Sequence, residues 1–539
     1  MPRHKILCLT HLWVSMGLLA PAVLLGAWQM WERSPLPAPF DSPGAYYASV
    51  TAHGTTMAYV MTTFFAMGMG YTIADTTLGR PMRGGAVAWV SFTICTIGTV
   101  LAVGTALSGT ASVLYTFYPP LTGNPLYYLG ALLVVGGSWL WCGVMVANMA
   151  FYKREHPGRP VPLAMFAIVA TALLWFWTSL GVAAELVATV LPTAFGLKLL
   201  IDPGLSRTLF SITLHGIVYF WLMPAYIAFY TMVPQAAGGR LYSDTLGRLT
   251  FILFLVASLP VGLHHLFADP EHGTSWKFMQ SIFTAMVVLP TLLTIYTIPA
   301  SLEIAGRLRG GRGVIGWVTR LPWDQPMIVA VALSLVMLGF GGFGGVVNMS
   351  YAMDSMVHNT QWVTAHFHLI FGGAVVIMYM AICYEFFPRL LGRPLPSLRM
   401  ARIQLILWAV GMIVLTFPWH ITGLMGMPRR YASFDYANPF YAPMGPLVVC
   451  SVVGGLILLI SVVMLVVNLL ATHWEPRAET GLIRWALTVN PPQHVPVALN
   501  GFALWNGIVF VMMAVGYAYP IYQAIGPGAL PVSVVVGGH

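Results

Sequence analysis

The sequence predicts an all-α integral membrane protein, because it is strongly apolar, carries few charges and repeats apolar runs long enough to cross a bilayer. Hydrophobic residues make up 58% of the 539 residues, charged residues only 8%, and the mean hydropathy is +0.78. Soluble domains usually carry about a quarter charged residues, which excludes a water-soluble fold. The weak alternation typical of a membrane β-barrel is absent. We expect one transmembrane domain over residues 1–539.

Apolar runs recur along the whole chain at the length that crosses a hydrocarbon core about 30 Å thick. The first run follows Arg3 and Lys5, but it is too long for a secretory signal and shows no clear cleavage site before Trp31, so we expect a retained helix. The pattern predicts about thirteen helical spans, centred near Leu19, Val60, Gly98, Gly136, Leu174, Phe220, Val256, Val288, Leu338, Val376, Val410, Leu458 and Val511.

The basic residues predict the orientation of these spans. If the N-terminus is cytoplasmic, the inner segments carry about three times as many of the 25 lysines and arginines as the outer segments. The formal net charge of +9 then reflects topology rather than nucleic-acid binding. An odd number of spans would leave the C-terminus, His539, on the outer side. The five cysteines are scattered and predict neither a disulfide framework nor a thiolate metal site.

Histidines dominate the candidate functional residues. Ionisable side chains are unfavourable inside a bilayer, so each one within a span is a functional candidate. A lone histidine is more often a hydrogen-bonded packing residue, whereas paired histidines at one depth favour metal binding. Six fall at a single depth toward the outer side, from four helices that run in both directions: His53, His215, His264, His265, His366 and His368.

The spacing of these histidines indicates more than one metal centre. His366 and His368 are two residues apart and point to roughly opposite sides of a helix, at about 100° per residue, so one helix could serve two centres. His264 and His265 would diverge by about 100° in a regular helix, so the backbone must loosen for both to reach one metal. With His215 they would form a three-imidazole site with an open position, which suits copper and dioxygen chemistry.

A stripe of hydroxyl groups descends from His215 toward the cytoplasm. Residues four, seven and four apart share one face of the sixth span, and hydroxyls of the eighth span lie at matching depth. Such a file could relay protons or could be a packing seam, and its origin at a proposed metal ligand favours the relay. Its members are Tyr219, Tyr226, Tyr230, Ser243, Thr291 and Thr294.

Several motifs together resemble subunit I of haem-copper oxygen reductases, specifically the B family of ba-type cytochrome c oxidases. The likeness covers nearly the whole chain. It is carried by HGIVYFWLMP at 215–224, PVGLHHLFADP at 260–270 and VHNTQWVTAHFH at 357–368, with further similarity at 115–120 and 301–313.

The resemblance implies specific roles for these residues. His53 and His368 would be the axial ligands of a low-spin, b-type haem, and His366 the ligand of a high-spin, a-type haem. Copper would be held by His215, His264 and His265, and Tyr219 would be covalently joined to a copper-binding histidine. The hydroxyl file would be the single proton-uptake route. Haem propionates would contact Asn348, Asp354, His358, Arg429 and Arg430, a role that suits an arginine pair.

The resemblance also implies the activity, partners and location. A terminal oxidase of this family reduces dioxygen to water and pumps protons, with electrons from cytochrome c or a small copper protein. A dicopper site on a separate subunit II would receive those electrons, because nothing in this chain resembles such a site. A small single-helix subunit could complete the complex. The expected location is the cytoplasmic membrane of a prokaryote, among its lipids.

The sequence departs from the family pattern beside the first copper ligand. Leu214 and Gly216 flank His215 where the family usually has Gly-His-Pro, which changes the local helix geometry without removing the ligand. Ile217 stands where the A family has a glutamate, so the second proton route of that family is not supported.

Two other functions remain open at this point. A nitric oxide reductase shares the scaffold but favours added glutamates and lacks the tyrosine; Tyr219 argues against it, while Glu185 in the fifth span keeps it open. A secondary transporter would show paired repeats and charged midplane sites, and neither is visible.

Overall fold

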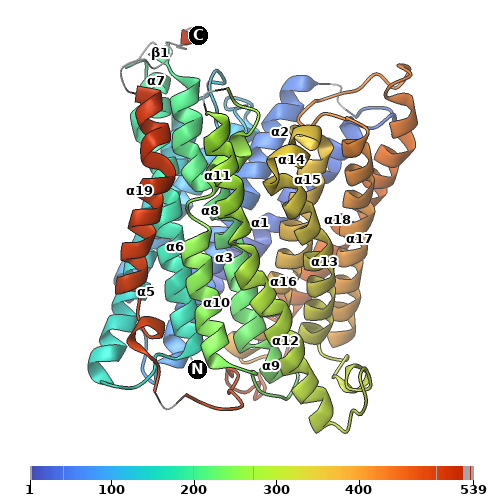
Figure 1. The fold of residues 1–539 in the computed structure, drawn as a ribbon. Coiled ribbons are helices and arrows are strands. Elements are labelled where there is room, and N and C mark those ends of the chain that lie inside the picture. Colours follow the sequence, from blue (N-terminus) through green and yellow to red (C-terminus); the bar gives the residue numbers. More distant parts are fainter. Residues whose placement is uncertain are drawn as a thin grey trace.

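The computed structural model is a bundle of long helices packed side by side (Figure 1). It describes residues 3–39, 42–197, 200–270, 272–492, 494–525 and 534–535. Within these residues, twelve helical stretches are long and apolar enough to cross a membrane. They span Lys5–Glu32, Pro43–Thr77, Gly85–Leu107, Pro125–Glu155, Leu163–Ala194, Pro203–Ala236, Thr274–Leu308, Pro326–Met349, Gln361–Leu391, Leu398–Leu424, Ala442–Ala471 and Ala503–Ile525.

The individual elements subdivide these stretches. The first half of the chain contains α1 Lys5–Glu32, α2 Pro43–Thr55, α3 Thr62–Thr77, α4 Gly85–Leu107, α5 Pro125–Glu155, α6 Leu163–Glu185, α7 Leu191–Ala194, β1 Leu200–Ile201, α8 Pro203–Thr231, α9 Val233–Ala236 and α10 Asp244–Ala257. The second half contains α11 Thr274–Ala285, α12 Val288–Leu308, α13 Pro326–Met349, α14 Tyr351–Val357, α15 Gln361–Phe367, α16 Val376–Leu391, α17 Leu398–Leu424, α18 Gly445–Ala471, α19 Ala503–Ile525 and β2 Val534–Val535. β1 pairs with β2 in antiparallel register.

The span expected near Val256 differs from the other twelve. Here α10 has 14 residues and ends at Ala257, and a 3₁₀ turn, Gly262–Leu266, follows. Pro260 lacks a backbone N–H and disfavours helix in the residue before it, so the helix stops soon after Ala257. The rest of this span is therefore an irregular backbone that includes the 3₁₀ turn with His264 and His265. This departure from a regular helix is what two adjacent histidines directed at one metal predict. The predicted C-terminus, His539, lies outside the described residues.

Several helices begin with the same local signal. Ser42, Asn124 and Asp202 each accept a hydrogen bond from a backbone N–H of the first helical turn, and a proline follows each of them directly. A polar cap satisfies an otherwise unpaired N–H, and proline fits the first helical position, where no N–H is needed. These caps fix where α2, α5 and α8 enter the bundle.

Three π-helical segments interrupt the long spans: Thr56–Met61 after α2, Leu186–Val190 after α6, and His368–Val375 after α15. Such segments are rare and often occur at functional sites, because each rotates the following side chains relative to a regular helix. Two of them adjoin candidate haem ligands, since His53 lies three residues before the first segment and His368 begins the third.

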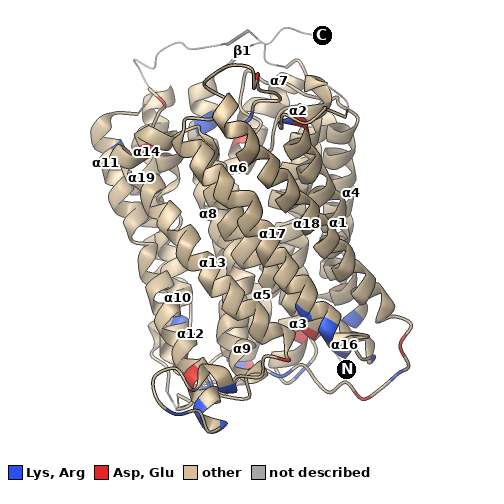
Figure 2. Ribbon diagram, turned by 90° about the vertical axis from the view of Figure 1, so that its right-hand side faces the viewer, with Lys and Arg blue, Asp and Glu red and all other residues tan. Residues whose placement is uncertain are grey.

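Charged residues lie mainly near the two ends of the bundle (Figure 2). Lys and Arg gather most densely at the end where the N-terminal residues lie. This distribution agrees with the positive-inside pattern expected from the sequence.

One buried ion pair joins three parts of that end. Arg248 on α10 is 1% exposed and pairs with Asp244 at 2.5 Å. Its guanidinium also donates to the carbonyl of Val161, between α5 and α6, and to the carbonyl of Leu499, before α19. The ring of Phe166 lies 5.1 Å from the guanidinium carbon. The pair therefore fastens α10 to two loops that are distant in sequence.

Replacing Arg248 by Met should destabilise the protein by about 3–5 kcal/mol, because Asp244 would be left buried without its partner. The measurement is thermal unfolding of the detergent-solubilised protein followed by far-ultraviolet circular dichroism. Arg320→Met, at an exposed position, should unfold like the wild type. Equal melting of both variants would contradict the structural role of the pair.

Candidate metal and haem site

Three imidazole rings converge inside the bundle. The ligand nitrogens of His215, His264 and His265 all lie within 4.8 Å of one another. Nδ1 of His215 and Nε2 of His265 are 3.3 Å apart, close to the separation of two nitrogens that each lie about 2 Å from one metal. His215 is on α8, whereas the other two are on the 3₁₀ turn. The cluster therefore fits the three-imidazole copper site expected from the sequence.

Close backbone packing holds the 3₁₀ turn against α8. A Cβ atom on Gly262 would lie 1.7 Å from the carbonyl oxygen of Ser211, so only glycine fits there. The hydroxyl of Tyr517 on α19 accepts a hydrogen bond from the N–H of Gly262 at 2.8 Å and donates to the carbonyl of Leu259 at 3.0 Å. These contacts set the height of the two adjacent histidines relative to His215.

Thr284 on α11 fixes the orientation of one ring. Its hydroxyl lies 3.0 Å from Nδ1 of His264 and donates to the backbone carbonyl of Gln280 at 2.7 Å. Because that hydroxyl hydrogen is used, Nδ1 of His264 must donate to the oxygen, which leaves Nε2 unprotonated for a metal. The sequence reasoning missed Thr284. It lies seven residues before Thr291 on the same helical face, which is the signal that could have revealed it.

The two candidate ligands of the low-spin haem face each other. The ring centres of His53 and His368 are 6.3 Å apart and their planes differ by 17°. If two imidazole nitrogens each lie about 2 Å from one iron, and each ring centre lies roughly 1 Å beyond its nitrogen, the two ring centres are separated by nearly this distance. Nδ1 of each ring lies 2.8 Å from a backbone carbonyl, that of Ala22 or Thr364, so Nε2 is free to ligate.

His366 faces a different helix from His368. Nδ1 of His366 lies 2.9 Å from the carbonyl of Gly341 on α13. A Cβ atom on Gly344 would be 2.9 Å from that Nδ1, and one on Gly345 would be 3.2 Å from Cε1 of the same ring. Glycines therefore let α13 approach the ring closely. His366 and His368 thus serve two separate positions from one helix, as their spacing predicts.

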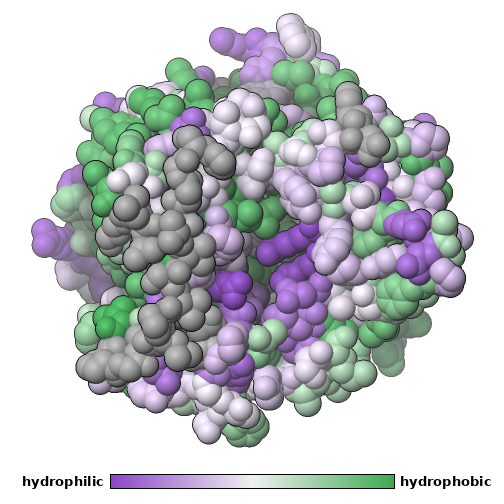
Figure 3. All heavy atoms as spheres, turned by 90° about the horizontal axis from the view of Figure 1, so that it is seen from above, coloured by the Kyte–Doolittle hydropathy of each residue, from purple (hydrophilic) through white to green (hydrophobic). Residues whose placement is uncertain are grey.

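The imidazole rings of the six histidines lie beside open space inside the bundle. All of these histidines except His264 are only half-buried, although the spans that carry His53, His215, His366 and His368 are mostly buried. The end of the bundle that bears α2, α14 and α15 is hollowed near its centre, with hydrophilic residues on the walls of the hollow (Figure 3). Internal space beside free imidazole nitrogens fits bound haem groups.

The residues expected to contact haem propionates lie in and around α14 and the loop after α17. Nδ1 of His358 lies 2.5 Å from a carboxylate oxygen of Asp354. Arg429 donates to the side chain of Asn359 at 2.8 Å, while its Nε has no hydrogen-bond partner among the described residues. Burial and then the neighbouring charge of Arg430 lower the pKa of Arg429. Two adjacent guanidinium groups with an unused donor fit a carboxylate ligand.

Asn348, at the end of α13, belongs to the same expected set. Its buried side-chain oxygen has no hydrogen-bond partner among the described residues. That oxygen is free to accept a hydrogen bond from a bound group or from water.

The hydroxyl file is connected only in part. The hydroxyl of Tyr230 lies 2.9 Å from that of Thr250 and 3.2 Å from that of Thr294. The ring of Phe254 packs against both Tyr219 and Tyr226, with ring centres 5.5 Å and 4.7 Å away. Proton transfer past Phe254 therefore requires intervening water molecules. Thr250 on α10 was not expected from the sequence, because only the fold brings it beside Tyr230.

The other members of the file make separate contacts. Ser243 caps α10 and accepts a hydrogen bond from the N–H of Leu246 at 3.2 Å. The hydroxyl of Thr291 is 3.5 Å from the carbonyl of Val287, a long contact that leaves it able to bond elsewhere. The ring of Tyr219 is 4.9 Å from the ring of His215.

Packing between α8 and α6 explains why glycine, rather than the usual proline of the family, follows His215. A Cβ atom on Gly216 would lie 2.4 Å from the hydroxyl oxygen of Thr178 on α6. A larger residue such as proline would clash there, so glycine at this position lets α8 and α6 pack closely. Glu185 lies elsewhere: it accepts a hydrogen bond from Ser206, nine residues or about 13 Å along α8 from His215.

Known proteins share this arrangement. The family model for cytochrome c and quinol oxidase polypeptide I matches residues 7–457. The chain belongs to this family. It is 39% identical to cytochrome c oxidase subunit 1 of Thermus thermophilus, over 89% of this chain and 87% of that protein. It is 26% identical to cytochrome c oxidase subunit 1 of Thermostichus vulcanus, over 92% and 90% of the two chains.

A solved structure is also similar. A haem-copper terminal oxidase, determined as a dimer, matches with a TM-score of 0.92 and 34% identity, over 97% of this chain and 93% of that one. The resemblance expected from the sequence is therefore confirmed. This oxidase subunit is the membrane-embedded catalytic subunit of a cytochrome c oxidase, a terminal respiratory enzyme that uses haem and copper.

Replacing Thr284 by Val should weaken copper binding about 10–100-fold, because His264 would lose the hydrogen bond that orients it. The measurement is copper retained per haem after dialysis against graded concentrations of a chelator. Ser275→Ala, at an exposed position on the opposite side of α11, serves as the control and should retain copper normally. If the Thr284 variant holds copper as tightly as this control, the positioning role is wrong.

Proposed function

We propose that the six histidines of this oxidase subunit hold two haems and one copper ion. His53 and His368 bind a low-spin b-type haem, His366 binds a high-spin a-type haem, and His215, His264 and His265 bind copper. The observation that supports this most strongly is the 6.3 Å separation of the two nearly parallel rings, beside a separate three-imidazole cluster. When bound, these groups supply electron transfer and the reduction of dioxygen.

The protein contributes the orientation of the ligands. Hydrogen bonds from Nδ1 to the carbonyls of Ala22, Gly341 and Thr364 fix the tautomers of three rings and leave Nε2 as the ligating nitrogen. His215 instead turns Nδ1 toward His265, and its Nε2 has no partner among the described residues. That nitrogen is the atom through which the proposed covalent bond to Tyr219 would form.

Tyr219 is proposed to supply a proton and an electron from its phenol during cleavage of the O–O bond. The residue is buried on α8, one turn below His215, with their ring centres 4.9 Å apart. No carboxylate joins the three-imidazole cluster within the described residues, since Glu185 is bonded to Ser206 instead. The site thus favours dioxygen over nitric oxide as substrate.

Protons are proposed to arrive from the cytoplasm along the hydroxyl file. Ser243 lies at the inner end, and further along the file Thr294 and Tyr230 lie within hydrogen-bonding distance of each other. Transfer continues through Thr291 and Tyr226 to Tyr219, with water completing the gaps. Charges that meet at the site from opposite sides of the membrane store about 2.3 kcal/mol per charge per 100 mV, and we propose that the subunit also pumps protons.

The partners and the orientation follow from the same proposal. The end rich in Lys and Arg faces the cytoplasm together with the N-terminus (Figure 2). Four of the five cysteines are buried and the fifth, Cys450, stands alone, so an electron-entry site of paired cysteines belongs to a separate subunit II with two coppers. The donor is a cytochrome c or a small copper protein, and a single-helix subunit could join the complex.

Replacing Tyr219 by Phe should abolish dioxygen reduction while both haems and the copper remain bound, because only the phenol hydroxyl is lost. Oxygen consumption by the purified complex measures this, with haem spectra and copper analysis on the same sample. Tyr71→Phe, a buried position on α3 that lies 18 residues after His53 and packs against His11 rather than against the six proposed ligands, should keep full turnover. Normal oxygen consumption in the Tyr219 variant would refute the role of the phenol.

Replacing Tyr230 by Phe should slow turnover roughly 10²–10⁴-fold, because it removes a hydroxyl that touches both Thr250 and Thr294. Binding of carbon monoxide to the reduced enzyme should not change, since the ligand histidines are untouched. Stopped-flow measurement of proton uptake separates the two effects. Unaltered proton uptake would show that the file is a packing seam.

A further inference from the structure

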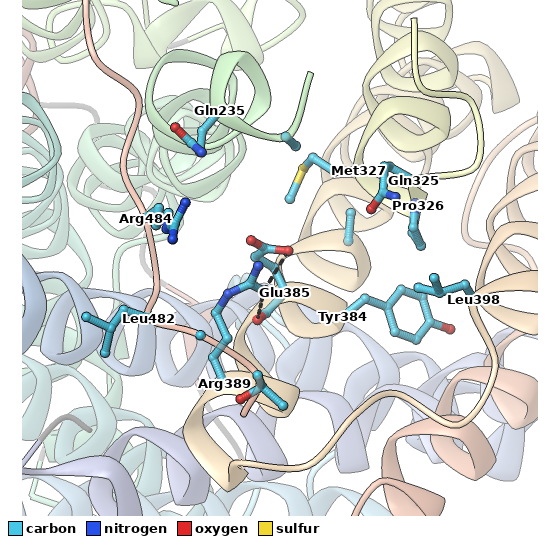
Figure 4. Close-up of a pocket in the computed structure, with 14 residues that line it drawn as sticks. Gln235, Gln325, Pro326, Met327, Tyr384, Glu385, Arg389, Leu398, Leu482 and Arg484 are labelled. Atoms are coloured by element: carbon cyan, nitrogen blue, oxygen red, sulfur yellow. Dashed lines mark hydrogen bonds and ion pairs between the residues drawn. The ribbon is translucent and has the colours of Figure 1, made fainter. Parts of the chain in front are cut away.

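A polar cavity of about 340 Å³ lies beside α9, at the end of the bundle where Figure 1 shows the N-terminal residues, and Figure 4 shows it close up. Its walls are α9, the start of α13, the last turns of α16 and the segment 480–484 between α18 and α19. The volume falls in the range of small-molecule sites. Arg389 on its wall is 23 residues from His366, about 35 Å along the intervening helix, so the cavity is separate from the metal and haem site.

Two guanidinium groups and one carboxylate give the cavity a net positive charge. Nη1 of Arg389 pairs with Oε2 of Glu385 at 2.9 Å and donates to the backbone carbonyl of the same residue at 2.9 Å. These bonds occupy one nitrogen of that guanidinium. Its Nε is buried without a hydrogen-bond partner among the described residues. Arg484 carries five further donors.

The remaining walls combine amides with apolar surface. Arg484 and Gln235 lie on one side of the cavity, and Gln325 and Met327 on the opposite side, with Arg389 between them (Figure 4). Because Glu385 is already neutralised by Arg389, a cation would find no free carboxylate. The excess of donors over acceptors instead suits an anion with several oxygen atoms, and the apolar side chains suit an attached organic group.

The segment that closes the cavity is fixed at both ends. The N–H of Ala478 donates to the carbonyl of Gly392 at 3.1 Å, and the N–H of Ala486 donates to the carbonyl of Thr231 at 2.7 Å. Gly481 between them adopts a φ of +73°, a left-handed conformation that favours glycine. Arg484 is therefore presented to the cavity by a backbone tied to the ends of α8 and α16.

We propose that this cavity binds a phosphate-bearing anion through Arg389 and Arg484. Guanidinium groups bind phosphate oxygens with paired, charge-assisted hydrogen bonds. The phosphate could belong to a lipid headgroup or to a soluble compound, and the experiment separates these sources. The proposal does not depend on the assignment of the haem and copper ligands.

The test uses the purified, delipidated complex in a phosphate-free detergent. Equilibrium dialysis with labelled pyrophosphate probes a soluble source, and native mass spectrometry with phosphatidylglycerol probes a lipid. We expect one bound ligand per chain for at least one probe, weakened at least tenfold in Arg484→Gln. Arg477→Gln, at an exposed position before this segment and outside the cavity, should bind like the wild type, and Arg484→Lys should retain most of the binding.

The variants keep the test independent of folding and of catalysis. Arg484 makes no hydrogen bond or ion pair among the described residues, so R484Q should keep the wild-type haem spectrum and oxygen consumption. Binding of pyrophosphate alone would assign a soluble phosphate, and binding of phosphatidylglycerol alone would assign a lipid. Failure of both probes to bind at one per chain, or equal binding by R484Q and R477Q, would overturn the proposal.

Discussion

The orientation of imidazole rings inside the helix bundle is the constraint on which the rest of this structure depends. Each ring must present an unprotonated nitrogen to a metal, and a hydrogen bond at the other nitrogen sets which one that is. Ala22, Gly341, Thr364 and Thr284 provide these bonds for four of the rings. Helix interruptions and a required glycine occur beside the rings, at the 3₁₀ turn, at two of the three π-helical segments and at Gly262.

Much of this arrangement could be predicted from the sequence, because membrane helices obey simple rules of length and periodicity. Twelve of the thirteen expected span centres fall within long apolar helices of the described residues. The divergence of His366 and His368, and the loosened backbone at His264, followed from helix geometry alone. The family resemblance rested on these same motifs and is confirmed by comparison with known proteins.

The contacts that orient the ligands could not be predicted, because they join residues that only the fold brings together. Thr284 reaches His264 from another helix, and Thr250 reaches Tyr230 across 20 positions of sequence. The short α10 was missed because composition near Val256 remains apolar while Pro260 ends the helix. Arg389 and Arg484 contributed only to the predicted topology. Their convergence at the cavity beside α9 could not be predicted, because it depends on tertiary packing.

The central claim is that six converging imidazoles hold two irons and one copper. Its most direct measurement is a reduced-minus-oxidised spectrum of the purified complex, recorded with and without carbon monoxide, alongside metal analysis. The account predicts two haems and one copper per chain, with carbon monoxide bound by only one haem, because His53 and His368 would occupy both faces of the other. A single haem, two haems that both bind the gas, or a preparation without copper would contradict it.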